Sequence, residues 1–218
     1  MNFSCISATS QTSLSVNSRR TDSAHCMSED TGNGTLHSLL GQVPDRHHVH
    51  TRSTVAPSIN GRHPAPLELW QPDYCGDIDM AIAADGTWYH EGIPIRRAEL
   101  WQLFSGILRR EADGEYYLVT PVEKCRVTVA LHPLIITDVE RVTEEDRPTL
   151  TATLNAGGQF PICADYPLRL ESRASGAAYL ELPHGLSALC SRPAWYRLVD
   201  LADEDYGISS AGLRFFLA

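Results

Sequence analysis

The fold is decided by the stretch that begins CGDIDMAIAADGTWYHEGIPIRR at residues 75–97. Near its start, Ile78, Met80 and Ile82 alternate with less apolar residues, and this period of two is typical of a half-buried strand. The pair Asp85-Gly86 follows, and an Asp-Gly pair between strand-like runs favours a hairpin because glycine accepts a positive φ without steric cost. We therefore predict two antiparallel strands at the beginning of this stretch.

The period changes to that of a helix after residue 95. Apolar residues then recur three and four positions apart, at Leu100, Leu103, Phe104, Ile107 and Leu108. This spacing predicts a helix over 96–110, ended by the turn Asp113-Gly114. Alternating segments at 116–120 and 124–131 predict two further strands. The order strand, strand, helix, strand, strand predicts a mostly antiparallel sheet with one helix on one face.

The chain beyond Leu134 shows a similar mixture of strands and one helix. Strands are predicted at 134–142, 150–154, 160–163, 167–171, 178–182 and 213–217, and a helix at 193–203 with Ser191 as its N-cap. RAELWQLF at 97–104 is similar to RPAWYRLV at 192–199, which favours an internal repeat over chance similarity. The predicted fold class is α+β, with two small related halves, each an antiparallel sheet or roll with one helix.

Residues 1–63 differ in composition from the rest of the chain. They are rich in Ser, Thr, Asn, His and Gly and poor in large apolar residues, which is typical of disorder. An alternative for residues 1–26 is a mis-assigned start, with Met27 as the natural first residue. The predicted organisation is a disordered tail at 1–63, an N-terminal α+β domain at 64–142, and a mostly β C-terminal domain with one helix at 143–218.

Charge and composition exclude several classes of partner. The net charge is −9, so the basic stripe of a nucleic-acid-binding protein is not expected. No apolar run approaches the ~18 residues of a membrane span, and no apolar region marks a signal peptide. The six cysteines form no Cys-x-x-Cys pair, which is typical of reduced thiols. We expect a cytoplasmic protein without a nucleic-acid or membrane partner.

No cofactor is predicted. The sequence contains no P-loop, dinucleotide fingerprint, HExxH helix or Ser-His-Asp signature. The run His47-His48-Val49-His50 offers ligands for a transition metal. A polar linker is the favoured interpretation of that run, because a disordered tail supplies no outer layer of hydrogen bonds to orient metal ligands.

Five motifs in the central stretch occur in one order: CGDIDM at 75–80, DGTW at 85–88, GxPIxR at 92–97, LFSxxLRR at 103–110 and VTPVEK at 119–124. Together they resemble the bacterial domain-of-unknown-function family 1285 (DUF1285). The resemblance covers about residues 66–218 and is looser in the second half, where SRPxxYxLV at 191–199 carries it. It implies a two-part α+β protein with repeated motifs and a suggested role in signalling. It implies no particular activity and no catalytic residue.

Candidate ligand-binding residues gather on and around the predicted strands of the first half. Asp77 and Asp79 lie two apart on one strand and so share a face, where carboxylates can bind a cation or divide an acid–base role. Lys124 is the only lysine of the chain, and with Glu123 and Arg126 it can pair the strand of Asp77 and Asp79 or bind an anionic ligand, a structural ion pair being favoured. The full set of candidates is Asp77, Asp79, His90, Glu123, Lys124 and Arg97. A solvated strand face with polar hairpin tips is the alternative.

Two functions from different classes remain open. The first is a non-enzymatic module that binds a small ligand or a protein partner, with the role in signalling that the family resemblance implies. The second is a metal-assisted hydrolase built on Asp77, Asp79, His90 and Glu123. The metal that such a hydrolase would use is not indicated by the sequence. An enzyme requires these four side chains to converge, whereas a binding module requires a pocket or an exposed patch without that constellation.

Overall fold

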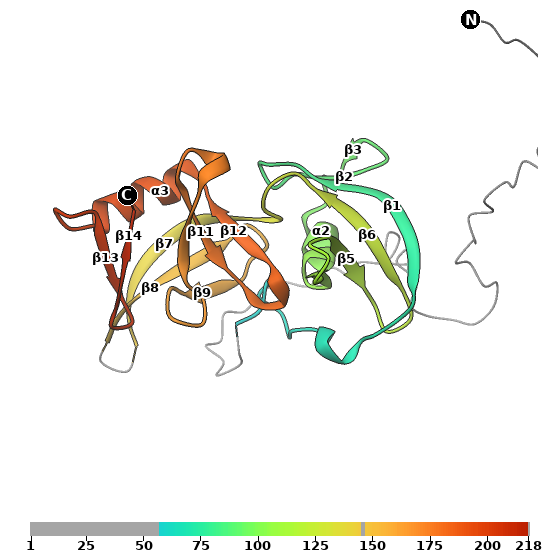
Figure 1. Ribbon diagram of the computed structural model, residues 1–218, viewed down its shortest axis with the longest axis horizontal. Helices are drawn as coiled ribbons and strands as arrows, with labels where there is room; N and C mark the ends of the chain where they lie inside the picture. The colour runs from blue at the N-terminus through green and yellow to red at the C-terminus, as the bar shows by residue number, and fades with distance from the viewer. Residues whose placement is uncertain (1–56, 145–146, 218) are drawn as a thin grey trace, which may run out of the picture.

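The computed structural model of the protein describes residues 57–144 and 147–217 (Figure 1). The first half contains six strands and one helix: β1 (Tyr74–Ile82), β2 (Trp88–His90), β3 (Ile93–Pro94), α2 (Ala98–Ser105), β4 (Leu108–Arg110), β5 (Tyr116–Val119) and β6 (Lys124–Val129). The second half contains β7 (Leu134–Glu144), β8 (Arg147–Leu154), β9 (Gln159–Pro161), β10 (Leu168–Glu171), β11 (Ala177–Glu181), β12 (Ser187–Cys190) and α3 (Arg192–Leu201). A hairpin of β13 (Gly207–Ser210) and β14 (Leu213–Phe216) follows, and short 3₁₀ turns lie at Leu67–Leu69, Ser172–Ala174 and Pro183–Gly185.

The two sheets have the same strand order. The first runs β3-β2-β1-β6-β5-β4, and the second, read in the matching direction, runs β9-β8-β7-β12-β11-β10. Each sheet therefore consists of two antiparallel three-stranded units that are joined by a parallel pairing of the first and last strand, β1 with β6 and β7 with β12. This confirms the α+β fold with two related halves. The local sequence pattern indicates where strands form but not which strands pair, so it did not predict the parallel pair.

The repeat does not follow the segments that look alike in the sequence. RAELWQLF forms α2, which lies between the third and fourth strands of its sheet, whereas RPAWYRLV forms α3, which follows the last strand of the second sheet. The two helices thus occupy different positions in the shared strand order. The similarity between them reflects two amphipathic helices that each pack on a sheet, while the repeat itself lies in the strands.

The first helix is shorter than the predicted span of 96–110. α2 ends at Ser105, and Leu108 pairs with Leu118 as the start of β4. Leu108 is fully buried in that pairing. Its apolar side chain fits the helical spacing and the strand equally well, and Gly106 is where the chain leaves the helix. The second helix agrees with its prediction, and the Ser191 side chain accepts a hydrogen bond from the Ala194 N–H as its N-cap.

The change from the first sheet to the second comes between Val129 and Leu134. The predicted division at 142–143 instead falls near the tip of the β7–β8 hairpin, where the two strands pair as far as Glu144 and Arg147. The charged run at 144–148 stands between two strands of one sheet, so this concentration of charge does not mark a boundary. The short connection at 130–133 carries no such concentration of charge.

Residues 57–63 are part of the fold and correct the predicted extent of the tail. We call residues 58–61 the strap, because they contact both halves. The Ile59 carbonyl accepts a hydrogen bond from the Gly158 N–H at 3.0 Å in the second half, and the Asn60 side chain donates to the Gln102 carbonyl at 3.2 Å in the first. The Ile59 side chain is 7% exposed. The run at 47–50 and the proposed start at Met27 lie outside the described residues.

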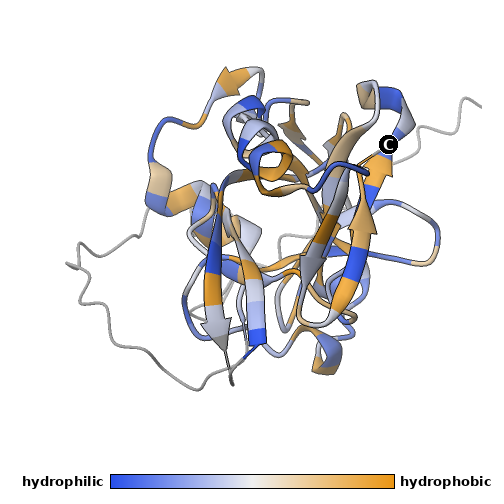
Figure 2. Ribbon diagram, turned by 90° about the vertical axis from the view of Figure 1, so that its left-hand side faces the viewer, coloured by the Kyte–Doolittle hydropathy of each residue, from blue (hydrophilic) through white to orange (hydrophobic). Residues whose placement is uncertain are grey.

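One continuous apolar core joins the halves. The strands alternate between hydrophobic and hydrophilic residues along their length (Figure 2), as expected for sheets with one buried face. In the first half, Phe104 of α2 packs on Trp88 of β2 with ring centroids 6.1 Å apart. In the second half, Phe160 is fully buried beside Tyr166. Both aromatic pairs belong to a single cluster of apolar side chains that includes residues of both sheets.

Candidate functional site

A row of polar side chains crosses four neighbouring strands of the first sheet. The register pairs Arg109 with Tyr117, Tyr117 with Arg126, and Arg126 with Asp77. Residues that pair directly across strands point to the same face of a sheet, so these four share one face. The face carries two guanidinium groups, a phenol and a carboxylate, and it includes the predicted site residue Asp77.

Asp77 and Arg126 form a bidentate ion pair. Arg126 Nε donates to Asp77 Oδ1 at 2.8 Å and Nη2 donates to Oδ2 at 2.6 Å, while the Tyr74 hydroxyl donates to Oδ1 as well. The hydrogen bonds from Arg126 and then Tyr74 hold the pKa of Asp77 below its usual range. Both members of the pair are partly exposed, at 42% and 57% of their side-chain surface. Asp77 is therefore a carboxylate with its oxygens already engaged, which orients Arg126.

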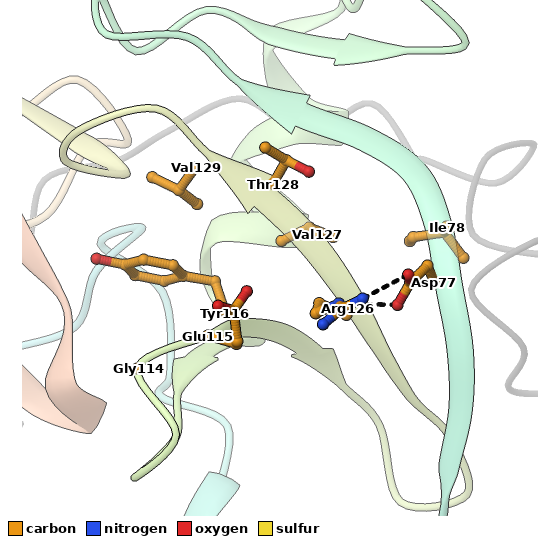
Figure 3. Close-up of a pocket in the computed structure, with 9 residues that line it drawn as sticks. All are labelled: Asp77, Ile78, Gly114, Glu115, Tyr116, Arg126, Val127, Thr128 and Val129. Carbon is orange, nitrogen blue, oxygen red and sulfur yellow. Dashed lines mark hydrogen bonds and ion pairs between the residues drawn. The ribbon is translucent and has the colours of Figure 1, made fainter. Parts of the chain in front are cut away.

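A hollow of about 430 Å³ opens beside this ion pair. β1 advances from Asp77 to Ala81 while β6 advances only from Arg126 to Thr128, so β1 carries a bulge of extra residues and its pairing with β6 is interrupted. Figure 3 shows the ion pair on one side of the hollow and Tyr116 on the other, with its hydroxyl directed away from Arg126. The lining residues are Asp77, Ile78, Gly114, Glu115, Tyr116, Arg126, Val127, Thr128 and Val129.

A second group of charges on the same sheet holds the chain before β1 in place. Arg109 Nη1 donates to the backbone carbonyls of Leu67 at 2.7 Å and Trp70 at 3.0 Å, and Nε donates to Glu111 at 3.1 Å. Lys124 Nζ lies 3.7 Å from the same Glu111 carboxylate and 5.3 Å from the centre of the Tyr117 ring. The only lysine of the chain thus has an ion-pair partner and an aromatic partner within the fold.

The six predicted site residues do not converge. Asp77 and Lys124 lie on the paired strands β1 and β6, where Tyr74 pairs with Lys124 and its hydroxyl donates to Asp77. The other four predicted site residues lie elsewhere. Asp79 is exposed on β1, His90 lies on β2, Glu123 precedes β6, and Arg97 at the N-cap of α2 lies 3.9 Å from Glu99. Among residues 57–144 and 147–217, no group of three His, Cys, Asp or Glu side chains is placed to hold a metal ion.

A buried polar cluster lies between the two sheets, centred on His132 in the connection from β6 to β7. His132 is 4% exposed. Its Nδ1 lies 2.7 Å from Ser187 Oγ, its Nε2 lies 3.2 Å from Glu171 Oε2, and its ring packs 4.8 Å from that of Tyr179. Sequence reasoning missed this cluster, because its members are far apart in the chain and only the sheet pairing brings them together.

The charges in the cluster fix the direction of its hydrogen bonds. The side chain of Arg173 and then its backbone N–H donate to Glu171, and these hydrogen bonds lower the pKa of Glu171 to about 2. Burial lowers the pKa of His132 despite the nearby carboxylate. At neutral pH Glu171 can only accept, so His132 Nε2 carries the proton and Nδ1 accepts from the Ser187 hydroxyl. The first half contributes Tyr116, whose pKa is raised by burial, and Arg110 and Ser187 offset part of that rise.

The protein is expected to lose stability as the pH falls below about 6.5, the ordinary pKa of histidine. Because burial lowers the pKa of His132 in the folded state, the unfolded chain binds the proton first, and each step toward lower pH favours unfolding. Burial lowers the pKa of His184 with the same sign. Glu171 adds a second loss as the pH falls from 4.5 toward about 2.

Urea unfolding between pH 5 and pH 8 measures the first of these losses. His132→Gln should reduce the slope of the free energy of unfolding against pH, and His184→Gln, which removes a half-buried histidine, should reduce it as well. The double variant should have a nearly flat profile over this range. A double variant with the wild-type slope would show that other groups govern the acid response.

These features define an α+β protein whose two halves share one strand order, with a polar hollow on the first sheet and a buried histidine cluster between the sheets. The DUF1285 N-terminal domain, a domain of unknown function, matches residues 65–130, and the DUF1285 C-terminal domain, of a protein of unknown function, matches residues 133–217. The chain belongs to the DUF1285 family, as the sequence motifs predicted.

Two solved structures of the family are similar to this chain. A DUF1285 family protein from Silicibacter pomeroyi DSS-3 is 36% identical, with 85% of this chain and 94% of that chain covered and a TM-score of 0.66. A DUF1285 family protein from Shewanella baltica OS155 is 31% identical, with 56% of this chain and 91% of that chain covered and a TM-score of 0.47. No curated protein matches this chain. Within the part of the chain that the structure describes, no helix is long and apolar enough to cross a membrane.

Proposed function

We propose that this protein binds a small polar molecule with a carboxylate or phosphate group in the hollow beside Asp77 and Arg126. The observation that supports this function is the hollow itself, which opens where the bulge of β1 interrupts its pairing with β6. Its walls carry a guanidinium, a carboxylate, a phenol and a hydroxyl, from Arg126, Glu115, Tyr116 and Thr128. A few convergent polar groups in a concave site are typical of small-molecule binding.

Arg126 is the residue that would recognise the anionic group. Its hydrogen bonds to Asp77 use Nε and Nη2, so Asp77 does not engage the two N–H groups on Nη1. The bidentate pair also holds the guanidinium plane in one orientation, which reduces the entropy lost when a ligand binds. A guanidinium fixed in this way favours planar carboxylates and phosphates over neutral ligands.

Metal-assisted hydrolysis has less support than ligand binding. Asp77 is paired with Arg126 and Tyr74, and the described residues offer no set of three metal ligands. A protein partner is the alternative occupant of the same face. A change on this face when a small ligand binds would suit the role in signalling that the family resemblance implies. The screen described next separates the small-ligand hypothesis from that of a protein partner.

A thermal-shift screen of carboxylated and phosphorylated metabolites is expected to raise the melting temperature of the wild-type protein. Binding to the folded state alone adds about 2.7 kcal/mol to the free energy of unfolding when the free ligand is at a hundredfold excess over Kd. Arg126→Gln should abolish that shift, because glutamine keeps hydrogen-bonding capacity but loses the charge.

Arg169→Gln is the matched control for this screen. Arg169 also forms a partly exposed ion pair, with Glu181 at 3.4 Å, but it lies on β10 of the second sheet. The Arg169→Gln variant should keep the wild-type shift in melting temperature with the ligand. A screen without any shift, or a shift that Arg126→Gln leaves unchanged, would contradict binding in the hollow and would favour a protein partner.

A further inference from the structure

We propose that Ser187, His132 and Glu171 form a nucleophilic site that hydrolyses small carboxylic esters. The Ser187 hydroxyl lies 2.7 Å from His132 Nδ1, and His132 Nε2 lies 3.2 Å from Glu171 Oε2. A hydroxyl, an imidazole and a carboxylate in such a hydrogen-bonded chain are the arrangement that activates a serine in hydrolases. This activity uses neither Asp77 nor Arg126, so it stands or falls independently of ligand binding through that ion pair.

The burial of the three side chains suits their roles. His132 and Glu171 are shielded, with 5% and 12% of their side chains exposed, whereas Ser187 at the start of β12 is half-buried. The base and its orienting carboxylate are thus protected from water, while the nucleophile is nearer the surface. In most Ser–His–acid sites Nε2 faces the serine, and here Nδ1 does so. The chemistry requires only that one ring nitrogen accepts while the other donates.

Tyr116 connects this site with the hollow. Its side chain lines the hollow with its hydroxyl directed away from Arg126 (Figure 3), and Ser187 of the second half is near enough to influence its pKa. A phenol near the nucleophile can donate a hydrogen bond to the negative charge that develops in an acyl-transfer intermediate.

The reaction has two balanced steps. In the first, Ser187 Oγ forms a bond to the carbonyl carbon, its proton passes to His132 Nδ1, and the alkoxide leaves as an alcohol after taking that proton. In the second, His132 Nδ1 removes a proton from water, the resulting hydroxide attacks the acyl-serine, and Ser187 regains its proton as the acid leaves. Glu171 stabilises the imidazolium in both steps through its hydrogen bond with Nε2.

A fluorophosphonate tests the nucleophile directly in the full-length protein. Attack by Ser187 forms an Oγ–P bond and expels fluoride, while the proton passes to His132. Intact mass and peptide mapping should find one adduct per chain, on Ser187, together with slow release of p-nitrophenol from p-nitrophenyl acetate. Ser187→Ala should lose both the adduct and the turnover. Ser209→Ala, at an exposed serine of β13, is the matched control and should keep both.

Two further variants separate catalysis from structure. His132→Gln, whose fold is checked by circular dichroism, should lower the labelling rate by roughly 10⁴-fold, because glutamine keeps the hydrogen bonds but cannot take the proton. Glu171→Gln, at a positioning residue, should slow labelling and move the midpoint of its pH profile to lower pH, because the Glu171 charge raises the pKa of His132. The other charged groups near the histidine are Arg173 and Arg110.

The proposal is overturned by any of three results. These are the absence of an adduct on Ser187 in the folded wild-type protein, a wild-type labelling rate in folded His132→Gln, and equal loss of labelling in Ser209→Ala and Ser187→Ala. If His132→Gln does not fold, the pH profile of the Glu171→Gln variant decides instead. An unchanged midpoint in that profile would likewise reject a role for His132 as the base.

Discussion

Gly158→Ala is expected to detach the strap from the second half and to lower the free energy of unfolding by about 3 kcal/mol, the combined effect of overpacking and of lost apolar burial. A Cβ atom at Gly158 would lie 2.1 Å from the Ser58 carbonyl oxygen and 2.5 Å from that of Ile59. Both atoms belong to the backbone, so no side chain can rotate to relieve the clash. The strap must move, and it then loses the buried Ile59 side chain and the hydrogen bond to Gly158.

Amide hydrogen exchange measures this detachment. In the variant, the Gly158 amide and the amides of the strap should exchange faster, while those of the central strands β5 and β6 keep their protection at mild denaturant concentrations. A chain that begins at residue 63 provides the control, because it lacks the strap and should tolerate Gly158→Ala at little cost. If the substitution were equally harmful in both chains, the clash with the strap would not be its cause.

Phe104→Ala and Phe160→Ala are each expected to lower the free energy of unfolding by about 4 kcal/mol, the usual cost of emptying a buried aromatic site. Phe104 is 1% exposed in the first half and Phe160 is fully buried in the second. Because both side chains belong to one continuous cluster, the halves should unfold together. For a chain of this size the loss corresponds to a fall in melting temperature of roughly 8–16 °C.

Differential scanning calorimetry distinguishes cooperative from independent unfolding. In the cooperative case each variant shows one transition, shifted by a similar amount whichever half carries the change. Leu69→Ala is the control, because Leu69 is 75% exposed and its truncation should leave the transition within about 0.5 kcal/mol of the wild type. Two transitions, of which only the one in the mutated half moves, would show that the halves unfold as independent units.

The sequence predicted local structure better than it predicted which strands lie next to each other in a sheet. The alternation from Ile78 to Ile82 and the Asp85-Gly86 turn appear in the structure as β1 and the turn before β2. Leu108 was misassigned to the helix, because an apolar residue shortly after a helix satisfies its period even when the residue belongs to a strand. Which strands pair could not be predicted, because β1 pairs with β6 and these are the first and last strands of the first half.

The candidate site was predictable only in part, because its residues come together through contacts between distant segments of the chain. Asp77 was found through its spacing from Asp79, and Arg126 was named with Lys124 as a group that can pair this strand, but the spacing did not show which cation would bind the Asp77 carboxylate. His132 was missed entirely. It lies between two predicted strands without a neighbouring acid or serine in sequence, and Glu171 and Ser187 reach it only after the second sheet has formed.

The pairing of the first and last strand in each half sets when that half can form during protein synthesis. About 50 residues separate the start of β1 from the start of β6, so a ribosome needs roughly 3–10 seconds to supply the partner of β1. For this time the nascent β1–β3 unit presents an unpaired edge, and β7 later waits in the same way for β12. An unpaired edge can pair with another chain. During its synthesis each chain therefore passes through two periods in which an unpaired strand edge can lead to aggregation.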